Sequence, residues 1–529
     1  MKSRVQTAAK MLLRDISPFS RLVIKLPLRT YQVEPLHAVL ESVFRELGRE
    51  FLLVFPRQSG KNEAVAQMLV YLLNLYQLRE CSIVYGAVGD ALGMGLQRLE
   101  ARLDNCWNAG EWKKRAGPDR RTLGKCSVLF LSSHPAASAR GQTAHLLLVL
   151  DEAQNQDPNH VEAVFTPMRA ANNATALYIG TVKTTSDFLW LKKRQLEALE
   201  AGDGIRRVFF VTPDQVTAEN PHYAAFLGDQ VTRYGRHHPI VASEYFLEPI
   251  DGAGGLFDAR RRLLMHGSHP RQAAPQPGAL YVATLDLAGE DEAATDPLAQ
   301  LNNPGRDYTV CTIFEVIFPP DGTRSPGPTY NAVDIFTDQG TRHFSTNAEP
   351  AVPRNEMGFD LVRRLAAHLE HWQVAHIISD STGVGLGVTS WLRSQLGDQR
   401  VTPYDFSRAR AKAALGNMFL ALIETNRFHY WADDEDIPLT DAWWFWQQCA
   451  ACTYDIPPDG TIDQHMRWWV PASHTTSTPA GPQPTHDDRL LSAALVAELD
   501  RLLRENEILL GMARSAVTHA GDPLGHDVY

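Results

Sequence analysis

The first half of the chain alternates short, continuously apolar segments with longer segments of helical periodicity. A strand without polar alternation must be buried on both faces, which is typical of a parallel sheet covered by helices. One segment of helical periodicity, 62–80, follows the first of these strands after a short loop. We therefore predict an α/β domain with a mostly parallel sheet, whose strands are 51–55, 81–88, 127–133, 145–152, 176–181 and 206–211.

The second half has a different pattern. Residues 251–278 are rich in Gly, Pro and Ala without a sustained period, so we predict a linker between domains 1–250 and 279–505. Three strands in hairpin order, then a helix and a further strand, predict a mixed sheet with helices on its faces. The predicted elements are strands 279–289, 307–318, 329–337 and 374–380 and helices 358–371, 409–425 and 487–505, with surface insertions at 289–306, 319–328 and 473–486 and a tail at 506–529.

Composition narrows the class of protein. A chain of 529 residues with 44% hydrophobic residues can bury two cores. The net charge of −10 argues against a polycation but allows a basic channel on one face. Six scattered cysteines indicate reduced thiols, and for Cys449 and Cys452 ordinary packing is favoured over metal or redox use. Because no segment reaches the roughly 18 apolar residues of a membrane span, we expect a soluble, cytoplasmic protein without membrane partners.

The segment "FPRQSGKNEA" (55–64) is similar to a phosphate-binding loop. A strand, a loop ending in Gly60-Lys61 and a helix follow in the order that such a loop needs, with backbone N–H groups facing an anion and Lys61 reaching the β- and γ-phosphates. Phe55 replaces the usual first glycine, and Asn62 replaces the Ser or Thr that holds Mg²⁺. The Asn62 amide oxygen is a neutral hard ligand and so a substitute for that hydroxyl.

Two further features accompany the loop. The strand in "HLLLVLDEAQ" ends in Asp151, suited to position Mg²⁺, and Glu152, suited to orient a water; the alternative is a pair of solvated carboxylates. In "LPLRTYQVEPL" (26–36), the Gln32 amide offers a donor and an acceptor, as the adenine edge does. Alone, Gln32 would be an ordinary helix-start residue. Together the three features predict a site for ATP and Mg²⁺.

In this combination the chain resembles the large terminase subunit of tailed double-stranded DNA bacteriophages. That family's ATPase has an upstream adenine-reading Gln, a variant loop x-R-Q-x-G-K, a strand ending in DE, and a coupling segment, here "YIGTV" (178–182) with Thr181. The resemblance implies that an arginine stabilises the transferred phosphate, either Arg57 in the same subunit or Arg140 acting on a neighbour; a surface or loop-anchoring role is the alternative for Arg140. It also implies nucleotide contacts from Gln32, Arg57, Gln58, Ser59, Gly60, Lys61, Asn62 and Asp151.

Acidic residues in the second half stand where predicted strands end and a helix begins. Asp286 follows "LYVATLD", Asp380 ends "AHIISD", and Asp487-Asp488 open a helix. If the fold brings them together, they can hold two Mg²⁺ or Mn²⁺ ions that activate a water and stabilise the leaving oxygen. The alternative is that each caps a helix or lies in a turn. The sequence leaves the choice between Asp487 and Asp488 open.

The same residues lie in segments that resemble the terminase nuclease, whose fold is like ribonuclease H. "SDSTGVGLGVTSWL" and "HDDRLLSAAL" resemble its second and third acidic motifs. "GRDYTVCTIFEV" resembles its second strand, which makes Asp307 a supporting candidate, and the helix in 407–430 places Lys412 near phosphate. The chain departs from the family in an acidic insertion that is either a solvated loop or tunes metal or DNA access, with Glu290, Asp291, Glu292 and Asp296.

The resemblance implies a motor that packages double-stranded DNA into a procapsid and cleaves concatemeric DNA. It implies a portal protein, a small terminase subunit, a ring expected to be a pentamer with a monomer as the alternative in solution, and a location in the host cytoplasm. A helicase-like nuclease is one alternative, but the further helicase motifs it needs are not found. A decayed DNA-binding scaffold is another, and the intact Lys61, Glu152, Asp286 and Asp380 argue against it.

Overall fold

The computed structural model divides the chain into two compact units. Unit 1 comprises Met1–Asp229 with Pro239–Asp251, and unit 2 comprises Gln230–His238 with Gly252–Tyr529. None of the helices in the described part of the chain is long and apolar enough to cross a membrane. The structure describes residues 10–115, 119–137, 139, 141–250, 255–288, 307–320, 325–339, 361–383, 385–408, 410–457 and 460–505.

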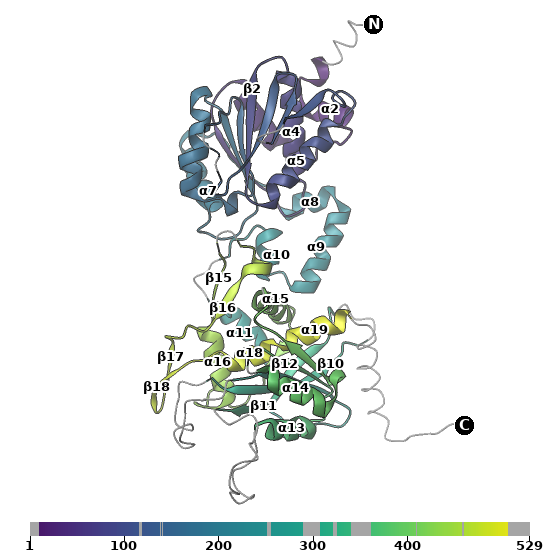
Figure 1. Ribbon diagram of the computed structural model, residues 1–529, viewed down its shortest axis with the longest axis vertical. Coiled ribbons are helices and arrows are strands. Elements are labelled where there is room, and N and C mark those ends of the chain that lie inside the picture. The colour runs from purple at the N-terminus through teal and green to yellow at the C-terminus, as the bar shows by residue number, and fades with distance from the viewer. Residues whose placement is uncertain are drawn as a thin grey trace, which may run out of the picture. The chain divides into compact units, whose positions relative to one another are not determined.

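Unit 1 is built on an eight-stranded sheet in the order β3-β4-β5-β2-β6-β7-β1-β8 (Figure 1). Six strands are parallel, and an antiparallel hairpin, β3–β4, extends one edge. This confirms the predicted α/β class, while the hairpin was not predicted. The strands are β1 Glu50–Val54, β2 Cys81–Ala87, β3 Trp112–Arg115, β4 Arg120–Leu123, β5 Cys126–Ser132, β6 Leu147–Leu150, β7 Thr175–Gly180 and β8 Val208–Phe210.

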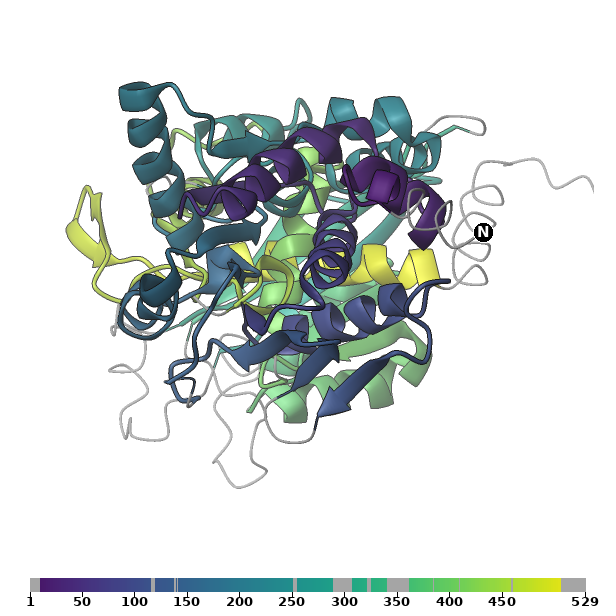
Figure 2. The ribbon, with the colours of Figure 1, turned by 90° about the horizontal axis from the view of Figure 1, so that it is seen from above.

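Helices cover both faces of this sheet, as Figures 1 and 2 show. Val84 and Leu129 share a core cluster with Leu189 of α7. Tyr85, the next residue along β2, points to the other face, where a Cβ added at Gly95 of α5 would lie 2.8 Å from its hydroxyl oxygen. The main helices are α3 Thr30–Phe44, α4 Lys61–Tyr76, α5 Asp90–Leu103, α7 Phe188–Asp203, α8 Pro213–Glu219, α9 Pro221–Tyr234, which continues past Asp229, and α10 Pro239–Glu244.

Unit 2 has a six-stranded mixed sheet in the order β13-β12-β9-β10-β11-β14. The central strands β9, β10 and β11 are antiparallel neighbours, while β12 runs parallel to β9 and β13 parallel to β12. The predicted mixed sheet is thus confirmed. The strands are β9 Leu280–Asp286, β10 Thr309–Ile317, β11 Thr329–Asp338, β12 His376–Asp380, β13 Val401–Tyr404 and β14 Phe428–His429, with small hairpins β15 Thr453–Asp455 and β16 Arg467–Trp469, and β17 Thr475–Thr478 and β18 Gly481–Pro484.

Alternation along β9 separates two cores in unit 2. Val282 lies in a cluster with Leu420 and Ala493, whereas Ala283 lies in a cluster with Leu365 and Leu392. Each face of the sheet is therefore covered by its own helices, which makes the unit three-layered. The helices are α11 Ala259–Met265, α13 Leu361–His371, α14 Gly385–Leu396, α15 Ala411–Glu424, α16 Asp441–Ala451, α17 Ile462–His465, α18 Asp488–Ala494 and α19 Val496–Glu505.

The predicted linker, 251–278, differs from the structure. Over its described part it contains α11, and Leu256, Phe257 and Met265 are buried in the core of unit 2. A segment that buries three large apolar side chains packs as part of the unit, and its Gly/Pro-rich composition did not reveal this. The insertion 289–306 and the tail 506–529 lie outside the described residues.

Candidate active sites

The loop between β1 and α4 has a backbone conformation that suits a phosphate-binding loop. Gln58 and Gly60 have φ angles of +62° and +92°, in the left-handed region. Gly60 caps α4, whose first residue is Lys61. The Tyr31 hydroxyl donates to the Ser59 carbonyl at 2.7 Å and so anchors the loop from α3. The loop thus ends at a helix N-terminus, where backbone N–H groups attract an anion.

Gln32 lies against this loop. Its amide nitrogen donates to the Gly60 carbonyl at 3.1 Å, and its amide oxygen accepts from the Arg29 backbone N–H at 2.9 Å. Buried and bonded at both ends of its amide, Gln32 positions the loop in this structure. Its contact with adenine stays a prediction.

The two candidate arginines differ in what can be said of them. Arg57 pairs with Glu244, with its Nη1 2.5 Å from the Glu244 Oε2, and its side chain is about half exposed. It also helps to lower the pKa of Glu152 through its charge. Arg57 is therefore within electrostatic reach of the site. Arg140 lies outside the described residues.

Directly after β6, two carboxylates meet the start of α4. Lys61 Nζ lies 3.2 Å from Glu152 Oε1 and 3.8 Å from Asp151 Oδ1. Asp151 is fully buried, and the Tyr85 hydroxyl donates to its Oδ2 at 2.6 Å. Asn62 donates to the same oxygen at 3.3 Å through Nδ2. The structure thus brings the predicted loop and the predicted DE pair together.

The charges at this centre depend on one another. Burial raises the pKa of Asp151 above its ordinary value, and Lys61 offsets this only in part. For Glu152, burial also raises the pKa, but Lys61 and Gln154 outweigh it, so the net pKa is lowered. Burial lowers the pKa of Lys61, but the two carboxylates raise it by more, so the net pKa lies above its ordinary value. Lys61 and Glu152 therefore form a charged pair at neutral pH.

Two oxygen groups at this centre suit a hard divalent cation. The Asn62 Oδ1 is buried and makes no hydrogen bond, although Nδ2 of the same amide is bonded. Asp151 offers a carboxylate beside it. Mg²⁺ prefers such oxygen ligands and is commonly held by one or two carboxylates together with phosphates. The residues present therefore fit the predicted cation.

Sequence reasoning missed Gln154 and Tyr85. Gln154 donates through Nε2 to Glu152 Oε2 and, at 3.3 Å, to Thr181 Oγ1, and its Oε1 accepts from the Thr181 N–H at 3.2 Å. It therefore connects Glu152 to the end of β7, where the predicted coupling segment lies. Its place two residues after Glu152 in "DEAQ" was an available signal, whereas Tyr85 lies in an apolar strand without one.

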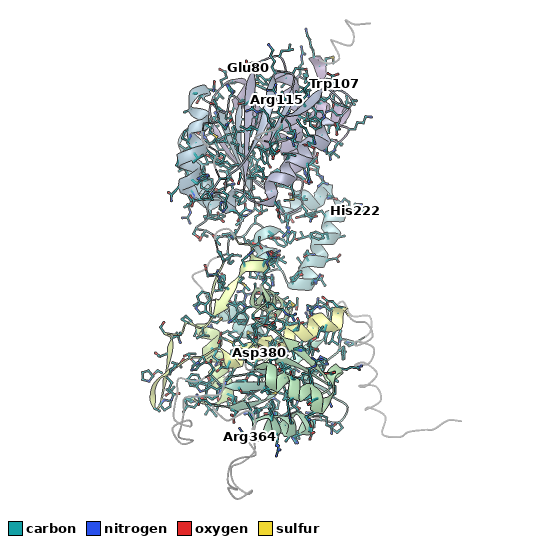
Figure 3. All side chains as sticks on the ribbon, viewed as in Figure 1. Glu80, Trp107, Arg115, His222, Arg364 and Asp380 are labelled. Carbon is teal, nitrogen blue, oxygen red and sulfur yellow. The ribbon has the colours of Figure 1, made fainter. Side chains whose placement is uncertain are left out.

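The second centre lies at the carboxyl ends of β9 and β12. These strands are parallel neighbours with Ser379 paired to Leu285, so the next residues, Asp380 and Asp286, lie side by side (Figure 3 labels Asp380). Helix α18 packs on β9 and β10, with the Ser492 hydroxyl donating to the Thr284 carbonyl at 3.2 Å. That contact places the start of α18, and so Asp488, near the two strand ends.

Clustering of these carboxylates changes their protonation. Burial raises the pKa of Asp286 well above its ordinary value, and Asp488, Asp380 and Asp487 raise it further. Burial raises the pKa of Asp380 as well. The pKa of Asp488 rises to about 7, again chiefly through burial. Divalent cations can neutralise buried carboxylates that repel one another in this way. The hard oxygens of these carboxylates suit Mg²⁺ or Mn²⁺.

The structure distinguishes the two aspartates that the sequence left open. Asp488 is buried, accepts from the Tyr308 N–H at 2.8 Å, and is the carboxylate that raises the Asp286 pKa most. Asp487 is partly exposed and lies 3.4 Å from Lys412 Nζ. Asp488 therefore faces the acidic cluster, while Asp487 is neutralised by the predicted phosphate-contacting lysine.

Asp307 and His486 lie beside Asp488. The Asp307 Oδ1 is 2.9 Å from the Nδ1 of His486, and the ligand atoms of Asp307, His486 and Asp488 all lie within 4.8 Å of one another. His486 was missed, although it directly precedes Asp487 in "THDDRL". Burial of both Cys449 and Cys452 agrees with ordinary packing. The acidic insertion, with Glu290, Asp291, Glu292 and Asp296, lies outside the described residues.

The fold and these centres define a chain with an α/β unit that carries a loop wound like a phosphate-binding loop, followed by a unit with a mixed sheet and a second acidic centre. The chain resembles large terminases of bacteriophages. One such large terminase, from a thermophilic bacteriophage, is 11% identical, with a TM-score of 0.43, covering 89% of this chain and 99% of that one. The HK97 bacteriophage large terminase is 12% identical, with a TM-score of 0.35, covering 89% and 95%.

A nuclease structure is similar to about half of the chain. The large terminase nuclease from thermophilic phage G20c with bound magnesium is 17% identical, with a TM-score of 0.29, covering 47% of this chain and 98% of that one. No family model matches the chain, and no curated protein matches it.

Proposed function

We propose that the chain is the ATP-driven motor and nuclease of viral DNA packaging, which translocates double-stranded DNA into a procapsid and cleaves concatemeric DNA. The observation that carries this proposal is the presence of two separate acidic centres in one chain. One joins Asp151 and Glu152 to a phosphate-loop lysine. The other gathers Asp286, Asp380 and Asp488 at the edge of a second sheet.

At the first centre, the proposed chemistry is hydrolysis of ATP. The phosphates bind at the start of α4, where Lys61 exchanges Glu152 for the β- and γ-phosphates. Glu152 is then free to hold the attacking water, with Gln154 keeping its second oxygen in place. Asn62 and Asp151 would hold Mg²⁺, which would supply positive charge to the phosphates and so stabilise the charge that develops on them. Arg57 or Arg140 supplies the remaining positive charge.

At the second centre, the proposed chemistry is hydrolysis of a DNA phosphodiester. Asp488 and Asp380 both raise the pKa of Asp286 through their charge, so Asp286 is the carboxylate that would contribute to both of two cation positions. Two cations held there, Mg²⁺ or Mn²⁺, would supply the charge that activates a water and stabilises the leaving oxygen. Lys412, paired with Asp487 in this structure, would contact the scissile strand.

The remaining parts of the proposal concern the assembly. By resemblance, the partners are double-stranded DNA, a portal protein on a procapsid and a small terminase subunit. The chain would work as a ring of five in the host cytoplasm, with a monomer as the alternative state before assembly. This part is tested by mixing the protein with a purified portal ring and measuring their association by sedimentation velocity.

The central test compares three full-length proteins in a phosphate-release assay and a plasmid-cutting assay. Lys61→Ala is expected to abolish ATP hydrolysis, because it removes the phosphate-binding cation, while leaving metal-dependent nicking. Asp380→Ala is expected to lower cleavage by about three orders of magnitude, because one cation loses a ligand, with normal ATP hydrolysis. Chelation should stop cleavage, and Mg²⁺ or Mn²⁺, but not Ca²⁺, should restore it. Wild-type cutting by Asp380→Ala would contradict the nuclease site.

A further inference from the structure

The β3–β4 hairpin at the edge of the unit 1 sheet is strongly basic. Residues 112–125 contain six cationic side chains and one carboxylate, in a chain whose net charge is −10. Lys113, Lys114 and Arg115 of β3 are all exposed. Figure 3 labels Arg115. The positive charge is thus concentrated in a short segment of the chain.

The pairing of the hairpin divides its cations between two faces. Trp112 and Lys114 point toward α5, because the Trp112 Nε1 donates to Asp104 at 2.8 Å and Lys114 Nζ lies 2.8 Å from Glu100. Arg121, paired across the strands with Lys114, also bonds to Glu100. On this face the cations are therefore neutralised within the protein.

The other face carries Lys113, Arg115 and Arg120. Arg115 is directly opposite Arg120 in the antiparallel pairing, and Lys113 is two residues along the same strand, so all three side chains share a face. Arg120 is in turn paired with Leu129, whose side chain belongs to the core beneath α7. Among the described residues, none of these three cations has a carboxylate partner.

This arrangement has a cost within the protein. Like charges directly opposite each other in an antiparallel pair are destabilising. Charged side chains on the edge strand β3 could serve to prevent it from pairing with another chain, and charges of either sign would do so. Such protection does not explain two opposed arginines and a lysine on one face without a counter-ion. A bound polyanion would remove the repulsion.

We propose that Lys113, Arg115 and Arg120 form a binding surface for the phosphate backbone of duplex DNA. Duplex DNA carries one negative charge per roughly 1.7 Å of its axis and binds rows of cations with release of counter-ions. The planar guanidinium forks of Arg115 and Arg120 match phosphate oxygens in geometry. The paired strands hold three such contacts in register without sequence readout, which suits a protein that moves along DNA. This inference rests on the proposed function, for which it supplies the contact surface in unit 1.

The test measures binding of a labelled duplex of arbitrary sequence to the full-length protein in EDTA, across a series of KCl concentrations. The test variant is Lys113→Gln/Arg115→Gln/Arg120→Gln. The control, Arg45→Gln/Arg79→Gln/Arg206→Gln, removes the same charge from the same unit at exposed arginines that pair with glutamates. The slope of log K against log salt should fall in magnitude by about 2.7 for the hairpin variant, at about 0.9 per lost phosphate contact. It should fall by less than about 1 for the control.

Equal changes in the two variants, or no change in the hairpin variant, would overturn the proposal. The proposal would also be overturned if polyglutamate displaced the labelled duplex as effectively as unlabelled DNA of equal charge does. The single variant Arg115→Gln checks folding, because removing the like-charge contact should leave the thermal midpoint unchanged or higher. ATP hydrolysis without DNA should stay normal in all variants. If the wild type binds DNA through these cations but neither hydrolyses ATP nor cuts DNA, the proposed function fails and the surface stands.

Discussion

At the scale of single residues, Asn62 stands at the position of the usual metal-binding hydroxyl and has a side-chain oxygen without a hydrogen bond. It directly follows Lys61, its Nδ2 is bonded to Asp151, and its Oδ1 is buried without a partner. A buried oxygen left without a partner costs free energy, and a bound cation would remove that cost. The departure from the usual Ser or Thr therefore keeps a buried oxygen at the position predicted to hold the cation.

The first prediction concerns this oxygen. Asn62→Thr should keep most ATP hydrolysis, because a hydroxyl also binds Mg²⁺. Asn62→Leu, of similar size but without a ligand, should lose it by about a hundredfold, with a higher Mg²⁺ requirement. The measurement is phosphate release over a Mg²⁺ titration. Near-normal rates for both variants would show that Asn62 is not a ligand.

The second prediction concerns Gln154, which bonds to both Glu152 and Thr181. Gln154→Leu should lower kcat for ATP about tenfold, since Glu152 loses the donor that orients it, while the Kd for a non-hydrolysable analogue stays near normal. Thr181→Val should add little to Gln154→Leu, because both variants break the same link. Phosphate release and analogue binding measure the four proteins of this cycle. Fully multiplicative effects on kcat would argue that the link has no role.

At the scale of elements, α18 determines which aspartate enters the acidic cluster. The helix is fixed on β9 and β10 by Ser492, which bonds to the Thr284 carbonyl and lies 2.9 Å from the Thr312 hydroxyl. Its first residue, Asp488, is buried, whereas Asp487, the residue before it, faces Lys412. One residue of helix register thus separates a buried carboxylate of the acidic cluster from one that pairs with a lysine.

The third prediction follows from this register. Asp488→Asn should reduce Mn²⁺-dependent plasmid nicking by about a thousandfold, because the cluster loses a buried charge that holds a cation. Asp487→Asn should reduce it by about tenfold or less, and is the matched control. Equal losses in both variants would mean that both carboxylates bind the cations.

At the scale of the whole molecule, the two units are not continuous in sequence. Gln230–His238 belongs to unit 2 although segments of unit 1 flank it on both sides. His238 is fully buried, and its Nε2 bonds to the Asn417 carbonyl at 3.0 Å. Burial lowers the pKa of His238 from 6.5 to about 4. The stability of unit 2 therefore depends on pH through this residue.

The fourth prediction gives the sign of that dependence. The unfolded chain takes up the proton near pH 6.5 and the folded one only near 4, so the contribution is complete above 6.5 and lost as the pH falls through 4. Between those values His238 should reduce the free energy of unfolding by about 1.4 kcal/mol per pH unit. His238→Gln keeps a donor without titrating. Urea unfolding followed by tryptophan fluorescence at pH 7 and 5 should give a smaller difference for the variant; an equal difference would contradict the assignment.

The sequence by itself determined the local features of this protein. Uniform apolar strands predicted the parallel sheet because burial on both faces leaves no polar alternation. Gly60 and Lys61 predicted the phosphate loop because its chemistry depends on neighbouring residues in the chain. The positions of Asp286 and Asp380 at strand ends were also visible, because strand ends can be read from hydrophobic pattern.

Tertiary structure decided what depends on contacts between distant segments. Gln154 meets Thr181 only because β6 and β7 are neighbouring strands, and Asp488 was separated from Asp487 only by the packing of α18. The 251–278 segment has the composition of a linker, yet its burial depends on a core assembled from residues far along the chain. Arg115 and Arg120 became opposed through strand register. Such contacts are set by packing and pairing over the whole fold, and a local sequence pattern does not encode them.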